Sequence, residues 1–365
     1  MIEEEGEGNM DLLGHTWMQR QLGQPVSCVF LTKNNDVIAG GWDGALRYWD
    51  AEGRQFWEVT TSSRVSSILE YDDMFVATSG LEVVAVSKND GAIMWVTALE
   101  GSSDGLLQFD NFIVATSSTY DIEHNDFIES AIWRISFEGE IEWVHRLDER
   151  PWYGYVDGQF AQFGLGRPRC GLLSISMESG ATSHTPFTID SPVMCGNSLD
   201  TGHIFGLASG HVVNESNIIH QALTGVEFLS TSHDGFLLGL DNGDCHLLNQ
   251  AGDEHWQLRG QAISGLLSAW SGPSSGYVWI ARKRLDEGEL VVVDEKEGAI
   301  IATSNTSRVH SMVSNEERLC IGFEDGQVIV WEREMFHRRQ GQASQSAEID
   351  PEKEAMRARL RALRG

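Results

Sequence analysis

Residues 40–57 have the sequence Gly-Gly-Trp-Asp-Gly-Ala-Leu-Arg-Tyr-Trp-Asp-Ala-Glu-Gly-Arg-Gln-Phe-Trp. Asp43 and Gly44 form the Asp-Gly pair that supplies the positive φ of a tight hairpin turn. The residues after this turn alternate between apolar and polar, which is the period of a strand. Gly53 marks a second turn, and Trp57 follows it by four residues. The stretch therefore predicts two hairpin turns that join three antiparallel strands.

The same parts recur along most of the chain. A turn glycine precedes an outer strand at Gly53, Gly91, Gly139, Gly180, Gly252 and Gly298. The gaps are 38, 48, 41, 72 and 46 residues, and the gap of 72 fits two units of 36, one of them degenerate near residues 214–217. Four units complete a Gly-x-x-x-Trp pattern, with Trp57, Trp95, Trp143 and Trp256. Self-similarity at this period predicts a series of small sheets.

The repeat divides the chain into seven units and a shorter eighth. Their bounds are 26–63, 64–101, 102–151, 152–190, 191–225, 226–261, 262–307 and 308 onward. The third unit contains a polar, acidic insertion at residues 119–129. The fifth unit is weak, so a count of seven stays open beside the expected count of eight.

The eighth unit lacks a fourth strand of its own. Residues 318–331 supply two strands, and the polar residues that follow do not continue the pattern. Residues 15–22, around Trp17, resemble the outer strands that carry a tryptophan. We expect them to pair beside residues 327–331, because a ring closed in this way leaves no free sheet edge.

These units resemble known repeat families. Four strands in about 40–45 residues are typical of a β-propeller. The Gly-Gly-Trp-Asp-Gly and Trp-Asp pairs of the first unit resemble a WD40 repeat, as does Gly322 to Trp331 in the last unit. The Gly-x-x-x-Trp strands are more similar to quinoprotein-like (PQQ-like) propellers, in which the tryptophan docks one blade onto the next. The resemblance implies an all-β, eight-bladed propeller of four-stranded antiparallel blades, closed by the N-terminal strand, with docking roles for Trp57, Trp95, Trp143, Trp256 and Trp17.

Outside the predicted propeller at residues 10–338, three segments have other compositions. Residues 1–9 are acidic and predict disorder, and residues 339–349 predict a flexible linker. Asp350 and Pro351 favour a helix start, so residues 350–365 predict a short, basic, amphipathic C-terminal helix. Its apolar face consists of Met356, Leu360 and Leu363. This face could dock in a partner's groove, or the helix could fold back on the propeller.

The charge is strongly negative and unevenly spread. The net charge is −28, from 26 basic and 54 acidic residues. Residues 331–365 hold 8 of the basic and 6 of the acidic residues, which leaves 18 and 48 in residues 1–330, a net charge of −30. Such a body repels nucleic acid and anionic membranes and attracts a basic protein partner. Solubility, or adaptation to a salty cell, is an equally good explanation.

Composition also bears on location and stability. No stretch approaches about 18 consecutive apolar residues, and the start of the sequence lacks a signal pattern, so we expect a cytoplasmic protein. The five cysteines are scattered, without a CxxC pair, which favours buried apolar side chains over zinc or disulfides.

Catalytic signatures are missing from the sequence. The resemblance to quinoprotein enzymes would imply an adjacent cysteine pair and calcium ligands, and no two cysteines are adjacent. There is no HExxH motif and no P-loop motif. His124 and Asp121 could join a metal site, but a solvated loop explains them better. We therefore expect no enzyme activity, no cofactor and no metal.

Binding residues are the stronger candidates. Links between blades lie near the central opening, on the face where propellers commonly bind, and they hold arginine and aromatic residues, which most often anchor interfaces. The candidates are Arg64, Arg308, Arg150, Trp152, Tyr153 and Trp42. The alternative is that the arginines pair with neighbouring acids and Trp152 packs between blades. The sequence thus favours a non-catalytic protein-interaction platform built on a monomeric ring, with an enzyme or small-ligand binder that uses the central funnel as the alternative.

Overall fold

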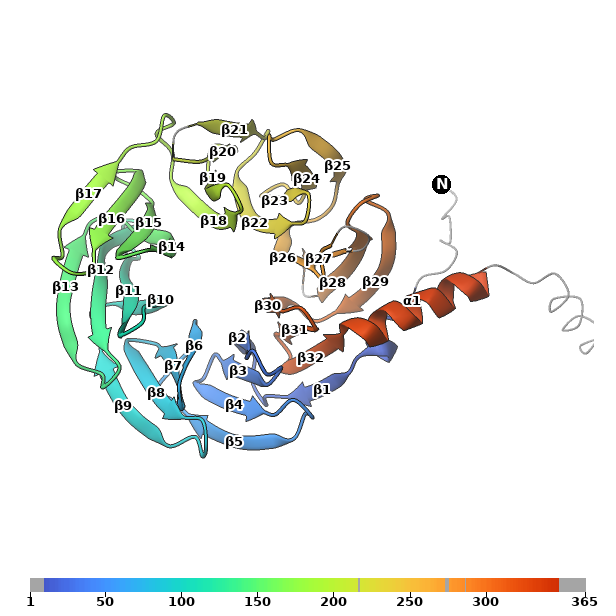
Figure 1. Ribbon diagram of the computed structural model, residues 1–365, viewed down its shortest axis with the longest axis horizontal. Coiled ribbons are helices and arrows are strands. Elements are labelled where there is room, and N and C mark those ends of the chain that lie inside the picture. Colours follow the sequence, from blue (N-terminus) through green and yellow to red (C-terminus); the bar gives the residue numbers. More distant parts are fainter. Residues whose placement is uncertain (1–9, 216, 273–275, 286, 348–365) are drawn as a thin grey trace, which may run out of the picture.

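The computed structural model describes residues 10–215, 217–272, 276–285 and 287–347, with side chains to residue 340. Within these ranges, the strands form eight four-stranded antiparallel sheets arranged as blades around a central opening (Figure 1). The weak fifth unit forms a complete blade, so the prediction of eight blades is confirmed and the alternative of seven is not. The predicted disorder of residues 1–9 lies outside the described residues.

The first four blades follow the order of the chain, from the innermost strand outward. Blade 1 contains β2 (Val26–Leu31), β3 (Val37–Gly41), β4 (Ala45–Trp49) and β5 (Gln55–Thr60). Blade 2 contains β6 (Ile68–Tyr71), β7 (Met74–Ser79), β8 (Glu82–Ser87) and β9 (Ile93–Ala98). Blade 3 contains β10 (Ser102–Gln108), β11 (Phe112–Asp121), β12 (Asp126–Ser136) and β13 (Ile141–Leu147). Blade 4 contains β14 (Pro151–Asp157), β15 (Phe160–Leu165), β16 (Gly171–Ser176) and β17 (Thr182–Thr185).

Three further blades repeat this order, and the eighth takes a strand from the other end of the chain. Blade 5 contains β18 (Val193–Leu199), β19 (Gly202–Leu207), β20 (His211–Val213) and β21 (Ile218–Gln221). Blade 6 contains β22 (Val226–Ser232), β23 (Gly235–Leu240), β24 (Cys245–Asn249) and β25 (Glu254–Leu258). Blade 7 contains β26 (Ile263–Ala269), β27 (Tyr277–Arg284), β28 (Glu287–Asp294) and β29 (Ile300–Thr306). Blade 8 contains β30 (Val309–Ser314), β31 (Arg318–Phe323), β32 (Gln327–Glu332) and β1 (Met18–Gln21).

The core lies between blades, because each sheet is covered on both faces by its neighbours. The second strands show this most clearly: all six residues of β7 and of β31 are buried. Leu46 of blade 1 and Phe75 of blade 2, each 0% exposed, belong to one apolar cluster across their junction. Strands covered on both faces carry nearly continuous apolar runs, which is why the alternating pattern is weak in the middle strands.

The antiparallel order gives the ring two distinct faces. Turns between the second and third strands of a blade lie on the same face as the links between blades; we call this the linker face. The remaining turns lie on the opposite face, the turn face. The distinction matters because the predicted binding residues come from links and from turns between the second and third strands.

Ring closure takes place as the sequence predicts. Strand β1 pairs antiparallel with β32, with Met18 opposite Val330 and Gln21 opposite Gln327. The guanidinium of Arg20 donates two hydrogen bonds, of 3.1 and 2.6 Å, to the Gly53 carbonyl of blade 1. The N-terminal strand therefore completes blade 8 and also contacts blade 1.

The helix at the C-terminal side differs from the prediction. Helix α1 spans Arg333–Ala347, so most of the predicted linker at 339–349 is helical and continues directly from β32. Phe336 is 0% exposed and packs against Trp270, Tyr277 and Trp279 of blade 7. One buried aromatic residue in a polar run is a weak sequence signal, which explains the error. The predicted helix at 350–365, with Met356, Leu360 and Leu363, lies outside the described residues.

The N-terminal segment packs beside this helix. A short 3-10 helix at Leu13–His15 precedes β1. Met10 and Leu12 are buried in the same apolar cluster as Phe336, and the indole of Trp331 donates a 2.9 Å hydrogen bond to the Leu12 carbonyl. Helix α1 contacts β32 and the 3-10 helix, and Figure 1 shows it leaving the ring at blade 8. Segments from both ends of the described chain thus meet at one blade.

Candidate functional site

Three predicted docking tryptophans share one geometry between blades. The indole N–H groups of Trp57, Trp95 and Trp256 each donate to a backbone carbonyl of the next blade, at 2.7 to 2.8 Å. Each ring lies on a turn glycine of that blade; a Cβ on Gly91 would lie 2.8 Å from Trp57. Glycine is required there because its φ is +72° and the ring leaves no room.

The other two predicted docking residues differ. Trp143 is half-buried, and its indole nitrogen has no hydrogen-bond partner among the described residues. A Cβ on Gly180, the turn glycine of blade 4, would meet nothing within 4 Å, so Trp143 does not dock on it. Trp17 lies over the Arg318 guanidinium at 3.8 Å. Arg318 in turn donates to the carbonyls of Asn35 and Ala51 in blade 1, so Trp17 docks through an arginine.

Two of the predicted binding residues meet on the linker face where the ring closes. The guanidinium carbon of Arg64 lies 4.0 Å from the centroid of the Trp42 ring, a cation–π arrangement. Trp42 also makes an edge contact with His310 of blade 8, at 5.7 Å between ring centroids. Residues from the first and last blades therefore form one aromatic and basic group, which the sequence could not show because about 270 positions separate them.

Arg308 belongs to the same region but is engaged by neighbours. Its Nε lies 3.7 Å from Glu324, and it donates a hydrogen bond to the Leu285 carbonyl. Burial lowers the pKa of His310; Arg64, Arg308 and Lys283 lower it further, whereas Glu324 raises it. The imidazole thus lies in a locally positive part of an acidic protein.

Arg150 and Trp152 form a second group, between blades 3 and 4. The Arg150 guanidinium lies between the rings of Phe127, at 3.8 Å, and Trp152, at 4.1 Å, and pairs with Asp104 at 2.9 Å. Burial raises the pKa of Asp104, although the guanidinium opposes this effect. Trp152 is still 39% exposed. Both predicted residues therefore lie at the linker face, but the Arg150 side chain is held by its ion pair and its two ring contacts.

Tyr153 is the exception among the candidates. Its ring covers Gly196 of blade 5 and contacts Phe205, and its hydroxyl lies 3.4 Å from Nδ1 of His203. Burial raises its pKa to about 12. The strand register shifts between Pro151 and Tyr153, which leaves Trp152 unpaired at a β-bulge and packed against Phe127, whereas Tyr153 packs between the blades.

The insertion at residues 119–129 is the site feature that sequence reasoning did not identify. It lengthens β11 and β12 into a hairpin whose tip exposes Ile122 by 86%. His124 and Asp121 contact each other there, with Nδ1 2.7 Å from the carboxylate, as expected for a solvated loop. The available signal was an apolar residue inside an acidic insertion.

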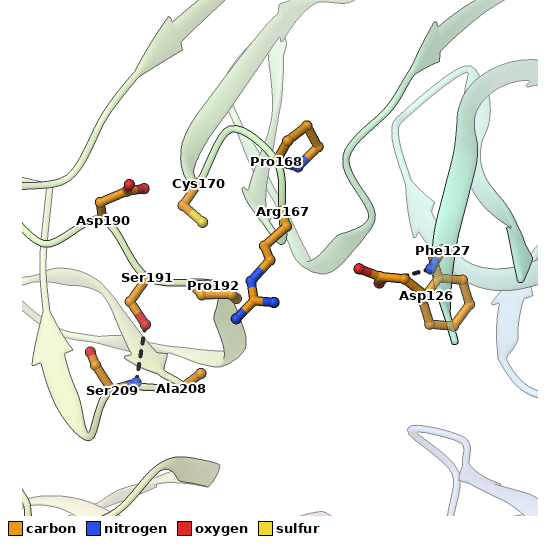
Figure 2. Close-up of a pocket in the computed structure, with 10 residues that line it drawn as sticks. All are labelled: Asp126, Phe127, Arg167, Pro168, Cys170, Asp190, Ser191, Pro192, Ala208 and Ser209. Atoms are coloured by element: carbon orange, nitrogen blue, oxygen red, sulfur yellow. Dashed lines mark hydrogen bonds between the residues drawn. The ribbon is translucent and has the colours of Figure 1, made fainter. Parts of the chain in front are cut away.

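A cavity of about 710 Å³ lies beside this hairpin on the linker face (Figure 2). The hairpin residues Asp126 and Phe127 form one wall, and loops of blades 4 and 5 form the other walls. Figure 2 shows the Arg167 side chain extending into the space between Asp126 and Asp190. A smaller cavity, of about 300 Å³, is lined by Asp104, Arg150, Trp152 and Tyr153 among others.

Exposed apolar side chains also mark the linker face. Each lies in a turn between the second and third strands, or in or next to a link between blades: Trp42, Leu81, Ile122, Trp152, Leu223 and Leu285. Leu223 and Leu285 are 99% and 94% exposed.

Within the described part of the chain, no three His, Cys, Asp or Glu side chains are grouped so that they could hold a metal ion. None of the helices in that part is long and apolar enough to span a membrane.

The architecture is that of an eight-bladed β-propeller. Solved structures with this fold include BamB from Moraxella catarrhalis, at a TM-score of 0.67 and 15% identity over 87% of this chain and 96% of that chain. Sqt1 from Saccharomyces cerevisiae has a TM-score of 0.68 and 11% identity, over 90% and 99%. The computationally designed Ika8 protein has a TM-score of 0.62 and 17% identity, over 87% and 98%.

No protein-family model matches the chain, and no curated protein does. At identities of 11 to 17%, the structural likeness shows the fold alone. Propellers host many unrelated functions, so function must be argued from the site.

Proposed function

We propose that this protein is a non-catalytic interaction platform that binds a protein partner on its linker face. The observation that carries the proposal is that two arginine–aromatic groups and several exposed apolar loop residues lie on the linker face, whereas most other exposed apolar side chains lie on the outermost strands. Trp42 with Arg64 and Trp152 with Arg150 are half-exposed, rigidly held groups, and rigid aromatic and arginine side chains are the usual anchors of interfaces. We take the protein to act as a monomeric ring in the cytoplasm, without a cofactor.

The charge of the body favours a basic partner. Residues 1–330 carry a net charge of −30. A field of this sign raises the local concentration of cationic molecules and speeds their association. Nucleic acids and anionic membranes would be repelled by the same field.

A small-ligand binder is the second candidate, supported by the cavity of about 300 Å³. Its polar wall is the Asp104–Arg150 pair, and its apolar wall includes Leu107 and Phe163. Ligand sites commonly combine apolar walls with a few convergent polar groups. Its volume is at the lower end of the range for ligand pockets, about 300–1,000 Å³.

The proposal can be tested by affinity purification from the native cell with matched surface variants. One variant carries Leu81→Asp, Leu223→Asp and Leu285→Asp on the linker face. The control carries Met94→Asp, Val156→Asp and Phe160→Asp on the outer rim and turn face, at positions that are also exposed. We expect a basic protein that binds the wild type and the control, with at least about tenfold less recovered by the linker-face variant. The proposal would be overturned if the control lost the partner while the linker-face variant kept it. It would also be overturned if both variants kept the partner.

A further inference from the structure

The hairpin β11–β12 is an arm on the linker face. We call residues 119–129 the arm. Phe127, which pairs across the hairpin with Tyr120, packs edge-on against Trp152, at 5.8 Å, and against the Arg150 guanidinium. At its tip, the Tyr120 hydroxyl donates a 2.6 Å hydrogen bond to Asn125. These contacts join the arm to the junction of blades 3 and 4.

The surface of the arm is apolar and acidic together. Tyr120, Ile122 and Ile128 are 47%, 86% and 42% exposed. The arm contains four carboxylates and no lysine or arginine. A partner that covers these apolar groups must therefore bring cationic groups with it, because unpaired carboxylates are costly to desolvate.

The cavity of about 710 Å³ continues this surface inward. Phe127, Pro168 and Pro192 give it apolar walls, and Asp126 and Asp190 stand on opposite sides (Figure 2). Arg167 is exposed and extends between them. Its lining thus holds two carboxylates and one guanidinium, so the local charge remains negative.

We propose that the arm and this cavity bind an extended segment of the partner in which basic and apolar residues alternate. This inference rests on the proposed function and names the chemistry of the partner. A lysine or arginine of the segment enters the cavity between Asp126 and Asp190, with its aliphatic stem on the proline walls. Apolar residues of the segment cover Ile122 and Ile128. Arg167 competes with the incoming cation for the two carboxylates.

Removing the Arg167 guanidinium should change the affinity in opposite directions for a cationic and for an anionic occupant of the cavity. If the cavity takes a cation, removing the guanidinium strengthens binding. If the cavity takes a carboxylate, the same change removes its only cationic group among the described lining residues and weakens binding.

The test uses two fluorescein-labelled octapeptides, one of alternating Lys and Leu and one of alternating Glu and Leu, with the full chain. The double variant with Asp126→Asn and Asp190→Asn should bind the Lys peptide with an affinity at least about tenfold lower than that of the wild type. Glu138→Gln with Glu140→Gln removes the same charge from the turn face and should change its affinity less than about twofold. Arg167→Gln should raise the affinity for the Lys peptide by about threefold. Thermal unfolding of each variant shows that the fold is kept.

Three results would overturn this inference: weaker binding by Arg167→Gln, equal losses in the two double variants, or no measurable binding of the Lys peptide. A preference for the Glu peptide would assign the cavity to a carboxylate instead. These failures are separate from failure of the proposed function, because the linker-face variant of the purification experiment leaves the arm and the cavity unchanged.

Discussion

At the scale of single residues, tryptophan and glycine act as a pair across blade junctions. Trp57 fills the space that the absent Cβ of Gly91 leaves open, and its indole nitrogen satisfies a carbonyl of the same turn. Apolar contact and a directional hydrogen bond thus act at one point. The pair fixes the position of one blade on the next.

Replacing Trp57 with Ala should therefore destabilise the ring strongly. Trp57 is 6% exposed, and truncating a buried aromatic residue costs about 3–5 kcal/mol. Chemical denaturation of the variant and the wild type measures the loss. Trp143→Ala, which removes no such hydrogen bond, should cost less. A loss below about 1 kcal/mol for Trp57→Ala would show that this residue does not hold the blades together.

The environment of His310 gives a second prediction at this scale. Arg64 disfavours the charged imidazole, so Arg64→Gln should raise the pKa of His310 toward its ordinary value. Burial should still hold the pKa below that value, because it is the larger cause. The ring signal of His310 in an NMR pH titration reports the change. Arg20→Gln, at the outer strand, is the control, and an equal shift in both variants would contradict the local effect.

The residue pattern predicted more of the scaffold than of the site. Gly-x-x-x-Trp correctly placed Trp57, Trp95 and Trp256 at junctions, because contact and hydrogen bond both follow from local spacing. It did not distinguish Trp143, whose neighbour is set by the geometry of blade 4. It also grouped Tyr153 with Trp152, although a β-bulge at Trp152 separates the surroundings of the two side chains.

At the scale of elements, β1 is the strand on which closure depends. It pairs with β32, and Arg20 joins it to blade 1. Removing residues 1–23 should expose the edge of β32 and open the core around Trp331, so we expect aggregation or a clear fall in melting temperature. Light scattering and thermal unfolding measure both. Removal of residues 1–9 alone is the control, and a monomeric, equally stable 1–23 deletion would contradict closure by β1.

Helix α1 should be a structural brace. Phe336 is fully buried against blade 7, so Phe336→Ala should cost about 3–5 kcal/mol. Glu334→Ala, on the exposed side of the same helix, should change stability by no more than about 0.5 kcal/mol. Equal effects of the two changes in chemical denaturation would show that the helix is only loosely attached.

Elements that depend on local pattern were predictable, and those that depend on distant partners were not. The strands, the turns and the borrowed strand follow from repeats. Helix α1 was mistaken for a linker because its one anchor, Phe336, finds its partners at Trp270 and Tyr277. The cavity beside the arm is formed by loops of three blades, and no residue spacing in the sequence predicts that these loops lie together.

At the scale of the whole molecule, the ring separates stability from recognition. The core lies between the blades, whereas the exposed apolar tips lie on loops of the linker face. Changes on those loops therefore leave the core contacts intact. The charge of −30 in residues 1–330 acts over the entire ring, beyond any single contact.

This charge should affect the association rate of the partner more than its dissociation rate. Screening shortens electrostatic interactions to about 8 Å at physiological salt and about 3 Å at 1 M. The association rate of a basic partner should fall at least about tenfold between low and high salt, because steering is lost. The dissociation rate should change much less, since it depends on close contacts at anchors such as Trp42 and Trp152. Surface plasmon resonance over a salt series, with sucrose as an uncharged control, measures both rates. A salt-independent association rate would show that the acidic body serves solubility and does not select the partner.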